Sequence, residues 1–399
     1  MAGLGRSGGR LFGVVALAVA CVYGGVGCGP AWTASSRPLS PSGGAGAVER
    51  SALPGATAAA CVDLSTWSTQ RLAARTVIVP VSEADVTGVK PQVTAGAGGV
   101  ILFGATAPTD LGTQIAALYS PSRTKLLVMT DEEGGGVQRM ENLVGSLPWA
   151  KDMGRLWTPA QIRTNVAAVA RRMAGYGVNM DLAPVVDVDG RDEPPSSTNP
   201  DGWRSFSGTT SVVSQDGLAF ARGLIDGGVI PVLKHFPGLG HATSNTDNGP
   251  ADTLAWSTLQ QVALPPFTAG IQAGMPSIMI ANARVPGLTT RPASLSPAVI
   301  TTQLRRTLGF RGLIMTDSLS ARAISGAGYT IPRAAVTSLD AGTDMVMYGP
   351  TGSLAATRQM FDQIVAAEVA AVQSGTLSRT RLVQAVTHIL RSQQTTVCA

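Results

Sequence analysis

Histidine, cysteine and aromatic residues are scarce in this sequence. Its 399 residues include 3 histidines and 4 cysteines, and aromatic residues make up 5%. No Cys/His group has the spacing of a zinc site, so a metal cofactor is not expected, and no other cofactor is implied. The apolar run at residues 11–20 is too short to span a bilayer.

Charge of one sign is not concentrated in any part of the chain. The 30 Lys and Arg residues exceed the 25 Asp and Glu residues, which gives a net charge of +5, but the basic residues are scattered. A protein that tracks a phosphate backbone needs a basic stripe, so nucleic acid is not an expected partner. With 44% apolar and 14% charged residues, the chain has a globular composition.

Residues 1–28 have the features of a bacterial export signal. Arg6 and Arg10 precede the short apolar run. Cys21 and Cys28 each follow small residues and resemble the lipidated cysteine of a lipoprotein signal, although neither has the favoured Leu three places upstream. We expect an exported protein held at the outer face of the cytoplasmic membrane by lipid on one of them. A plain secreted protein is the alternative.

Short apolar runs alternate with amphipathic stretches between residues 61 and 399, and this alternation is typical of a parallel α/β sheet. The predicted strands are 76–81, 99–103, 126–130, 179–184, 229–233, 277–281, 312–316 and 344–348. The clearest predicted helices are 162–176, 214–226, 259–273 and 354–374. Eight strands suffice to close a (β/α)₈ TIM barrel, but a doubly wound open sheet gives the same alternation.

Polar side chains at the carboxyl ends of these strands favour the barrel. They are Asp131 and Glu133, Asp187, Lys234 and His235, Asn282 and Arg284, and Asp317. In a barrel such residues converge on one face, where active sites lie, whereas an open sheet spreads them along a line. We therefore predict a single TIM-barrel domain over residues 61–399.

The remaining segments frame this domain. Residues 29–60 are rich in Ser, Pro, Gly and Ala without apolar periodicity, so they are predicted to be a flexible tether. Beyond the export region only Cys61 and Cys398 remain, at the two ends of the domain. Because an exported protein meets oxidising conditions and a barrel brings its first and last elements together, we expect these two to form a disulfide.

Several segments have the chemistry of a sugar site. Residues 131–139 place carboxylates and Arg139 around three glycines, which suits close contact with hydroxyl groups, although an ordinary turn with surface ion pairs is the alternative. Lys234 is either a fixed cation or a Schiff-base amine, and His235 lies beside it. Arg204, in an aromatic loop, suits a pyranose with an amide or carboxylate substituent. Asp317 is a candidate nucleophile or a helix N-cap.

Six motifs, in this order, resemble glycoside hydrolase family 3, and more narrowly its single-domain NagZ-type β-N-acetylhexosaminidases, including the actinobacterial lipoprotein version. They are Asp131-x-Glu133-Gly134-Gly135-x-Val137-x-Arg139, Leu182-Ala183-Pro184-Val185-x-Asp187-Val188, Arg204-Ser205-Phe206, Lys234-His235-Phe236-Pro237-Gly238, Pro292-Ala293-Ser294-Leu295-Ser296 and Met315-Thr316-Asp317-Ser318-Leu319. The match covers nearly all of residues 70–390.

The resemblance implies the activity and the role of each site residue. Asp317 is the expected nucleophile of a retaining mechanism through a covalent glycosyl-enzyme. The residues expected to hold the non-reducing sugar are Asp131, Arg139, Arg204, Lys234 and His235. The implied substrates are GlcNAc-β-1,4-MurNAc fragments of peptidoglycan, cleaved by a monomer.

The loop after the fifth strand departs from the family pattern. The NagZ type continues with His-Gly and then Asp-Ser-His, whose last His is the acid/base, but this sequence has Leu239-Gly240 and then Asn245-Thr246-Asp247. By position Asp247 replaces the acid/base, and to donate a proton it must be kept protonated by burial or by Asp317 nearby. His241 is the rival donor. A sugar-binding surface lipoprotein without activity and a β-glucosidase remain alternative functions.

Overall fold

The computed structural model describes residues 61–119 and 125–398. The predicted export signal and tether, with Cys21 and Cys28, lie outside the described residues. Among the residues described, no helix combines the length and the hydropathy needed to cross a membrane.

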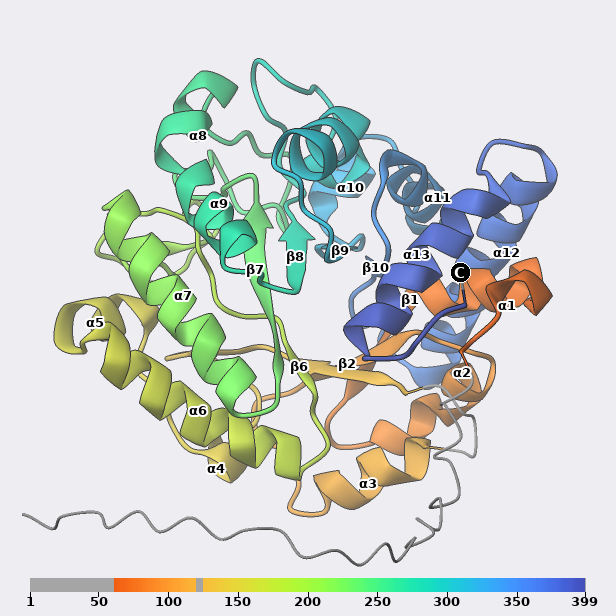
Figure 1. Cartoon of the computed structure of the whole chain (residues 1–399), viewed down its shortest axis with the longest axis horizontal. Coiled ribbons are helices and arrows are strands. Elements are labelled where there is room, and N and C mark those ends of the chain that lie inside the picture. Colours follow the sequence, from red (N-terminus) through yellow and green to blue (C-terminus); the bar gives the residue numbers. More distant parts are fainter. Residues whose placement is uncertain (1–60, 120–124, 399) are drawn as a thin grey trace, which may run out of the picture. The chain divides into compact units, whose positions relative to one another are not determined.

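Eight parallel strands form the centre of the fold (Figure 1). In the order of the sheet they are β10 (Val346–Met347), β1 (Val77–Ser82), β2 (Gly99–Phe103), β3 (Leu127–Thr130), β6 (Met180–Asp181), β7 (Ile230–Phe236), β8 (Ser277–Ile280) and β9 (Leu313–Thr316). A parallel bridge between Met315 in β9 and Met345, next to β10, joins the two edges of this sheet. The sheet therefore closes into a barrel, and all eight predicted strands are present, with β6 and β10 reduced to two residues each.

The strands are apolar on both faces because they lie between two hydrophobic layers. In β1, Val77 and Val79 pack into the large cluster shared with the helices, whereas Ile78 belongs to a second cluster in the barrel interior. Methionines from several strands fill this interior, among them Met129, Met180, Met279, Met315 and Met347. Alternate residues of a strand point to opposite faces, so burial on both sides gives the nearly continuous apolar runs of the sequence.

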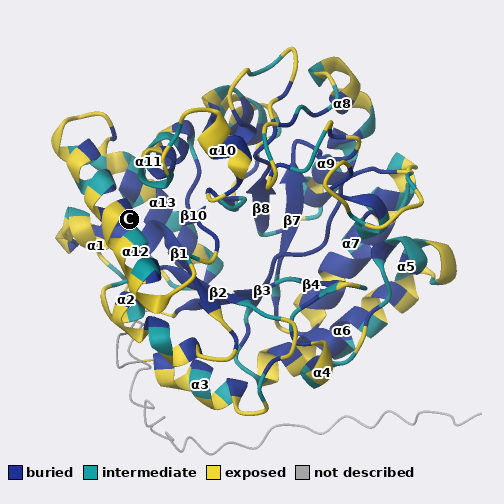
Figure 2. Ribbon diagram, turned by 180° about the vertical axis from the view of Figure 1, so that it is seen from behind, coloured by how far each residue is buried: buried dark blue, intermediate teal, exposed yellow. Residues whose placement is uncertain are grey.

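Helices surround the strands and turn their apolar faces inward (Figure 2). They are α1 (Thr69–Thr76), α2 (Lys90–Thr94), α3 (Leu111–Leu118), α4 (Glu141–Val144), α5 (Ala150–Leu156), α6 (Pro159–Gly175), α7 (Thr210–Asp226), α8 (Trp256–Val262), α9 (Leu264–Gln272), α10 (Arg322–Gly326), α11 (Ile331–Ala341), α12 (Leu354–Gln373) and α13 (Arg379–Ser392). A π-helix spans Ala298–Thr307. A small antiparallel hairpin, β4 (Glu132–Gly134) and β5 (Val137–Gln138), was not predicted.

Local chemistry sets the helix boundaries. Helix α6 begins with a capping box, because Thr158 accepts a hydrogen bond from the N–H of Gln161 at 3.3 Å and the Gln161 side chain bonds back. The single helix predicted at 259–273 is wrong, since α8 ends at Val262 and α9 begins at Leu264, with Ala263 as the cap between them. Pro265 and Pro266 have no N–H to bond back into α8, so the helix breaks there.

The two ends of the domain are joined covalently. Cys61 and Cys398 form the predicted disulfide. A parallel bridge between Val62 and Val397 lies beside it, with the N–H of Cys398 donating to the carbonyl of Val62 at 3.0 Å. The chain therefore returns to its starting point after one circuit of the barrel.

Candidate active site

A cavity of about 500 Å³ lies at the carboxyl ends of the strands. Among its lining residues are eight of the site residues considered in the sequence: Asp131, Glu133, Arg139, Arg204, Lys234, His235, Asp247 and Asp317. They come from the ends of different strands and the following loops, as expected of a barrel site. His241, Asn282 and Arg284 do not line it.

Alternating charges hold one side of the cavity in place. The Nζ of Lys234 lies 2.8 Å from Asp131 Oδ1 and 2.6 Å from Glu133 Oε1. Arg204 donates from Nε and Nη2 to the two oxygens of Glu133, at 2.7 and 2.8 Å. Arg139 lies further away, with its Nη2 3.8 Å from Asp131 Oδ2. A fixed array of donors and acceptors of this kind suits the hydroxyl groups of a sugar.

The ion pairs decide the chemistry of Lys234. Burial alone lowers the pKa of Lys234, but the carboxylates of Asp131 and Glu133 raise it above its ordinary value. Burial raises the pKa of Glu133, and the cations Arg204 and Lys234 outweigh that effect and lower it. The two carboxylates therefore favour the ammonium form of Lys234, which lacks the lone pair that a Schiff-base amine needs. The geometry favours the reading of Lys234 as a fixed cation.

Asp317 follows strand β9 and reaches the cavity. Its backbone N–H donates to Ile280 at 3.0 Å, and its Oδ1 accepts a hydrogen bond from the N–H of Ser318 at 2.6 Å. The alternative role as a helix N-cap is wrong, because the next helix, α10, begins at Arg322 with Ala321 at its N-cap. The carboxylate is thus left to face the cavity.

The surroundings of Asp317 act on its charge in both directions. Burial raises the pKa of Asp317, and the carboxylate of Asp247 adds to the rise. The hydrogen bond from the N–H of Ser318 and the charge of Lys234 act the other way. Burial lowers the pKa of His235 to about 4, so its imidazole is neutral at neutral pH.

Asp187 fixes the ring of His235. Its Oδ2 lies 2.7 Å from His235 Nδ1 and accepts the His235 backbone N–H at 3.1 Å, while Oδ1 accepts the N–H of Leu239 at 2.6 Å. Burial raises the pKa of Asp187 to about 7 against these hydrogen bonds. With Nδ1 engaged, Nε2 is the ring nitrogen available to a ligand.

Asp187, Asp201 and His235 form the one group of possible metal ligands that we find within residues 61–119 and 125–398, with donor atoms within 4.8 Å of one another. This set does not fit a metal ion. The Asp187 oxygens already accept N–H groups, and the guanidinium of Arg204 lies 4.0 Å from Asp201 Oδ1. Burial, with the charge of Asp187, also raises the pKa of Asp201 to about 8.

The loop after β7 separates the two candidate proton donors. Asp247 lines the cavity, whereas His241 is exposed outside it and its charge acts on Asp189. The side chain of Asn245 accepts the N–H of Asp247 at 2.9 Å, so it fixes the backbone there rather than the carboxylate. The burial expected to keep Asp247 protonated is absent, because this residue is exposed, but the expected proximity to Asp317 is present.

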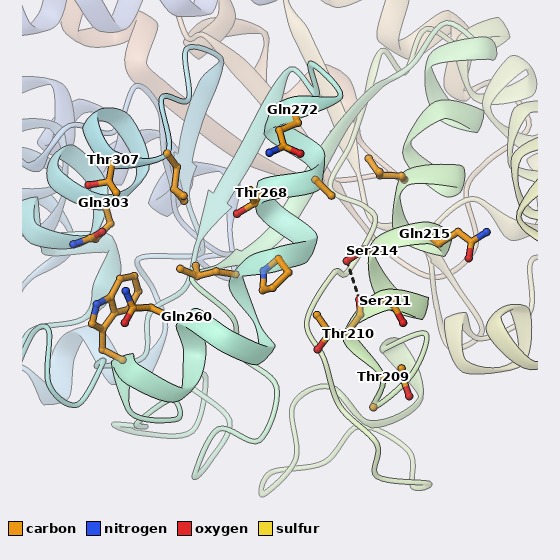
Figure 3. Close-up of a pocket in the computed structure, with 17 residues that line it drawn as sticks. Thr209, Thr210, Ser211, Ser214, Gln215, Gln260, Thr268, Gln272, Gln303 and Thr307 are labelled. Atoms are coloured by element: carbon orange, nitrogen blue, oxygen red, sulfur yellow. Dashed lines mark hydrogen bonds between the residues drawn. The ribbon is translucent and has the colours of Figure 1, made fainter.

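A larger hollow of about 1170 Å³ lies on the outside of the barrel, along α7, α8 and α9 (Figure 3). The polar side chains that line it, labelled in Figure 3, carry hydroxyl or amide groups, as in Ser211, Thr268 and Gln272. No residue that lines it is charged. Without an acid or a base it has no means of proton transfer, so the smaller cavity is the candidate active site.

The sequence did not reveal the roles of two residues at the site. Glu133 joins Lys234 to Arg204, and Asp187 orients His235, yet neither was included among the expected sugar-binding residues. Both lie inside the quoted motifs, at positions 131–139 and 182–188. The signal was therefore present, but only the structure shows which carboxylate pairs with which cation.

A closed barrel with carboxylates and fixed cations at the carboxyl ends of its strands is an architecture of sugar-cleaving enzymes. The model of the glycosyl hydrolase family 3 N terminal domain matches residues 90–392. The chain belongs to this family, as its motifs predict, and is a glycoside hydrolase.

The similarity to known proteins covers most of the chain. "Beta-hexosaminidase LpqI" of Mycobacterium tuberculosis is 32% identical over 365 residues, which cover 90% of this chain and 91% of that protein. The solved structure of M. tuberculosis LpqI has a TM-score of 0.74 at 28% identity, over 84% of this chain and 97% of that one. A family member from Mycobacterium smegmatis has a TM-score of 0.72 at 32% identity, covering 83% and 98%.

Proposed function

We propose that the protein is a retaining exo-β-N-acetylglucosaminidase that acts through a covalent intermediate on Asp317. The observation that carries the proposal is the position of two carboxylates, Asp317 and Asp247, at one cavity that the Asp131–Lys234–Glu133–Arg204 array also lines. Retaining glycosidases need two such groups flanking the scissile bond, one as nucleophile and one as acid/base.

Each residue then has a defined task. The charged array and Arg139 bind the hydroxyl groups of the terminal sugar, and neutral His235 offers Nε2 as a further hydrogen-bonding atom. The carboxylate of Asp317 attacks the anomeric carbon while Asp247 gives its proton to the departing oxygen. Asp247 then takes a proton from water, and the water oxygen attacks the same carbon and displaces Asp317. The released sugar has the same anomeric configuration as the substrate.

The substrate assignment rests on relatives as well as on the site. Several similar proteins carry the name beta-hexosaminidase, including one from Stenotrophomonas maltophilia that is 34% identical over 246 residues. We infer terminal β-linked N-acetylglucosamine, in GlcNAc-β-1,4-MurNAc fragments of peptidoglycan, as the substrate. An exported monomer, anchored by lipid on Cys21 or Cys28, would meet this polymer outside the cytoplasmic membrane. Release of the protein from membranes by an acyl-chain hydrolase tests the anchor.

Trapping and turnover together test this function. A fluorinated, slowly released N-acetylglucosaminide should add one sugar mass to the peptide that contains Asp317, and Asp317→Asn should remove both the label and turnover. The 4-nitrophenyl N-acetyl-β-glucosaminide should be cleaved faster than the corresponding glucoside. Label on another residue would overturn the mechanism. Preference for the glucoside would indicate a β-glucosidase, and binding without cleavage would indicate a sugar-binding lipoprotein.

A further inference from the structure

The loop that carries Asp247 is an ordered substructure tied to its neighbours. Five buried residues form a small hydrophobic cluster beneath it: Leu239, Ala242, Ala251, Ala281 and Ala283. The first three belong to the loop and the last two follow β8, so apolar packing fixes the loop to the end of the barrel wall.

Backbone hydrogen bonds tie the tip of the loop to both sides. The N–H of Asn245 donates to Ser197 at 2.9 Å, in the segment before Arg204. The N–H of Ala323 donates to the carbonyl of Thr246 at 3.0 Å, and Ala323 lies in α10, which follows Asp317. Backbone hydrogen bonds therefore join the segment that carries the proposed acid/base, Asp247, to the segment that follows the proposed nucleophile, Asp317.

The base of the loop is closed by one ion pair. Arg284 donates from Nε and Nη2 to the two carboxylate oxygens of Asp252, at 2.7 and 3.0 Å. Around it, the N–H of Thr253 donates to Arg284 and the N–H of Arg284 to Ala251, both at 2.9 Å. The N–H of Thr243 donates to the carbonyl of Asp252 at 2.9 Å, which closes the loop upon itself.

We propose that Arg284 and Asp252 act as a clamp that positions Asp247 for proton transfer. The inference rests on the proposed role of Asp247. Arg284 touches no part of the cavity, so it is a positioning residue, and its planar fork fits a carboxylate in a single orientation. Small displacements of a catalytic group are costly, because proton transfer requires hydrogen-bond distance.

The chain offers a matched control. Arg163 and Asp226, on α6 and α7, form a pair of the same geometry, with Nε and Nη2 2.6 and 2.9 Å from the carboxylate oxygens. The side chains are similarly exposed, 49% and 37% in the control pair against 44% and 35% for Arg284 and Asp252. Arg163→Met removes an equivalent surface ion pair away from the cavity, and should leave turnover unchanged.

The leaving group separates positioning from general damage. Cleavage of a GlcNAc disaccharide needs a proton donor, whereas a 2,4-dinitrophenyl N-acetylglucosaminide has a leaving group that departs without one. Arg284→Met should lower kcat/KM for the disaccharide by about fivefold, as expected for one half-exposed ion pair. It should leave kcat/KM for the dinitrophenyl substrate unchanged. Asp252→Asn should behave in the same way, and the double variant no worse than either.

Hydrogen–deuterium exchange gives a readout that does not depend on turnover. Peptides covering residues 239–253 should exchange faster in Arg284→Met than in Arg163→Met. Equal exchange in the two variants, or equal losses with both substrates, would overturn the clamp. If the unmodified protein cleaved neither substrate, the proposed function and the role of Asp247 would fall, while the exchange data would still decide whether the pair holds the loop.

Discussion

Replacing Glu133 by Gln tests how far the buried charge network holds the site together. Glu133 makes three short contacts with cations: one with Lys234 at 2.6 Å and two with Arg204 at 2.7 and 2.8 Å. The side chains of Glu133 and Lys234 are each 3% exposed, and that of Arg204 is 16% exposed. Solvent therefore screens these pairs only weakly.

The loss falls mainly on Arg204. Lys234 keeps Asp131 at 2.8 Å, but Arg204 keeps only the carbonyl of Pro200 at 2.8 Å and Asp201 at 4.0 Å. A Gln side chain at 133 can accept from one cation, while its NH₂ group faces the other. Removing one partner of a buried ion pair costs about 3–5 kcal/mol, and we expect Glu133→Gln to lower the free energy of unfolding by that amount.

Thermal unfolding measures this cost. In a domain of this size the loss corresponds to a fall in Tm of about 4–7 °C. Asp226→Asn, which breaks the exposed pair with Arg163, is the control and should cost under about 1 kcal/mol. If the two variants melted together, the network would contribute nothing beyond a surface ion pair, and the reasoning would be refuted.

The stability that Glu133 contributes should also depend on pH, in a direction that its pKa shift determines. The pKa of Glu133 is lowered in the folded protein, so its contribution to stability is complete above the pKa of the unfolded chain, about 4.3. That contribution is lost as the pH falls below this value and through the folded pKa. The unmodified protein should therefore lose stability in acid more steeply than Glu133→Gln.

Two further predictions concern the acid/base and the disulfide. Asp247→Asn should lower kcat/KM for a GlcNAc disaccharide by about 10²–10⁴-fold, and azide should restore turnover of an activated substrate by Asp247→Ala; normal kinetics in Asp247→Asn would contradict the assignment. Cys61→Ser with Cys398→Ser should lower the free energy of unfolding by about 2–4 kcal/mol in denaturant titrations and leave kcat/KM unchanged, since the bridge lies at the chain ends; an unchanged unfolding midpoint would contradict this.

The barrel was predictable because its strands are apolar on both faces. A run such as 99–103 is buried by the barrel interior on one side and by helices on the other, so it is visible without any tertiary information. The helix at 259–273 was mispredicted for a local reason, since apolar periodicity continues across Pro265 and Pro266 although the hydrogen bonds cannot. The hairpin at 132–138 has too few residues to show a strand period.

The contacts between charged side chains of the site could not be predicted from the sequence, for a different reason. Position along the chain showed that Asp131, Lys234 and Asp317 follow strands, which brings them to one face. It did not show that Glu133 lies between Lys234 and Arg204, or that Arg284 pairs with Asp252. The partners in each of these pairs are at least 32 residues apart along the chain. Side-chain pairing over such separations depends on the register of the closed sheet.

The exposure of Asp247 leads to a last prediction about pH profiles. In the empty cavity water reaches this carboxylate, but a bound sugar displaces that water while Asp317 remains close by. Losing this water beside the carboxylate of Asp317 favours the protonated form that donates to the leaving group. Because kcat/KM reports on the free enzyme and kcat on the complex, the basic limb of kcat should lie at higher pH than that of kcat/KM for a disaccharide. Coincident limbs, or limbs that persist unchanged in Asp247→Asn, would show that another group supplies the proton.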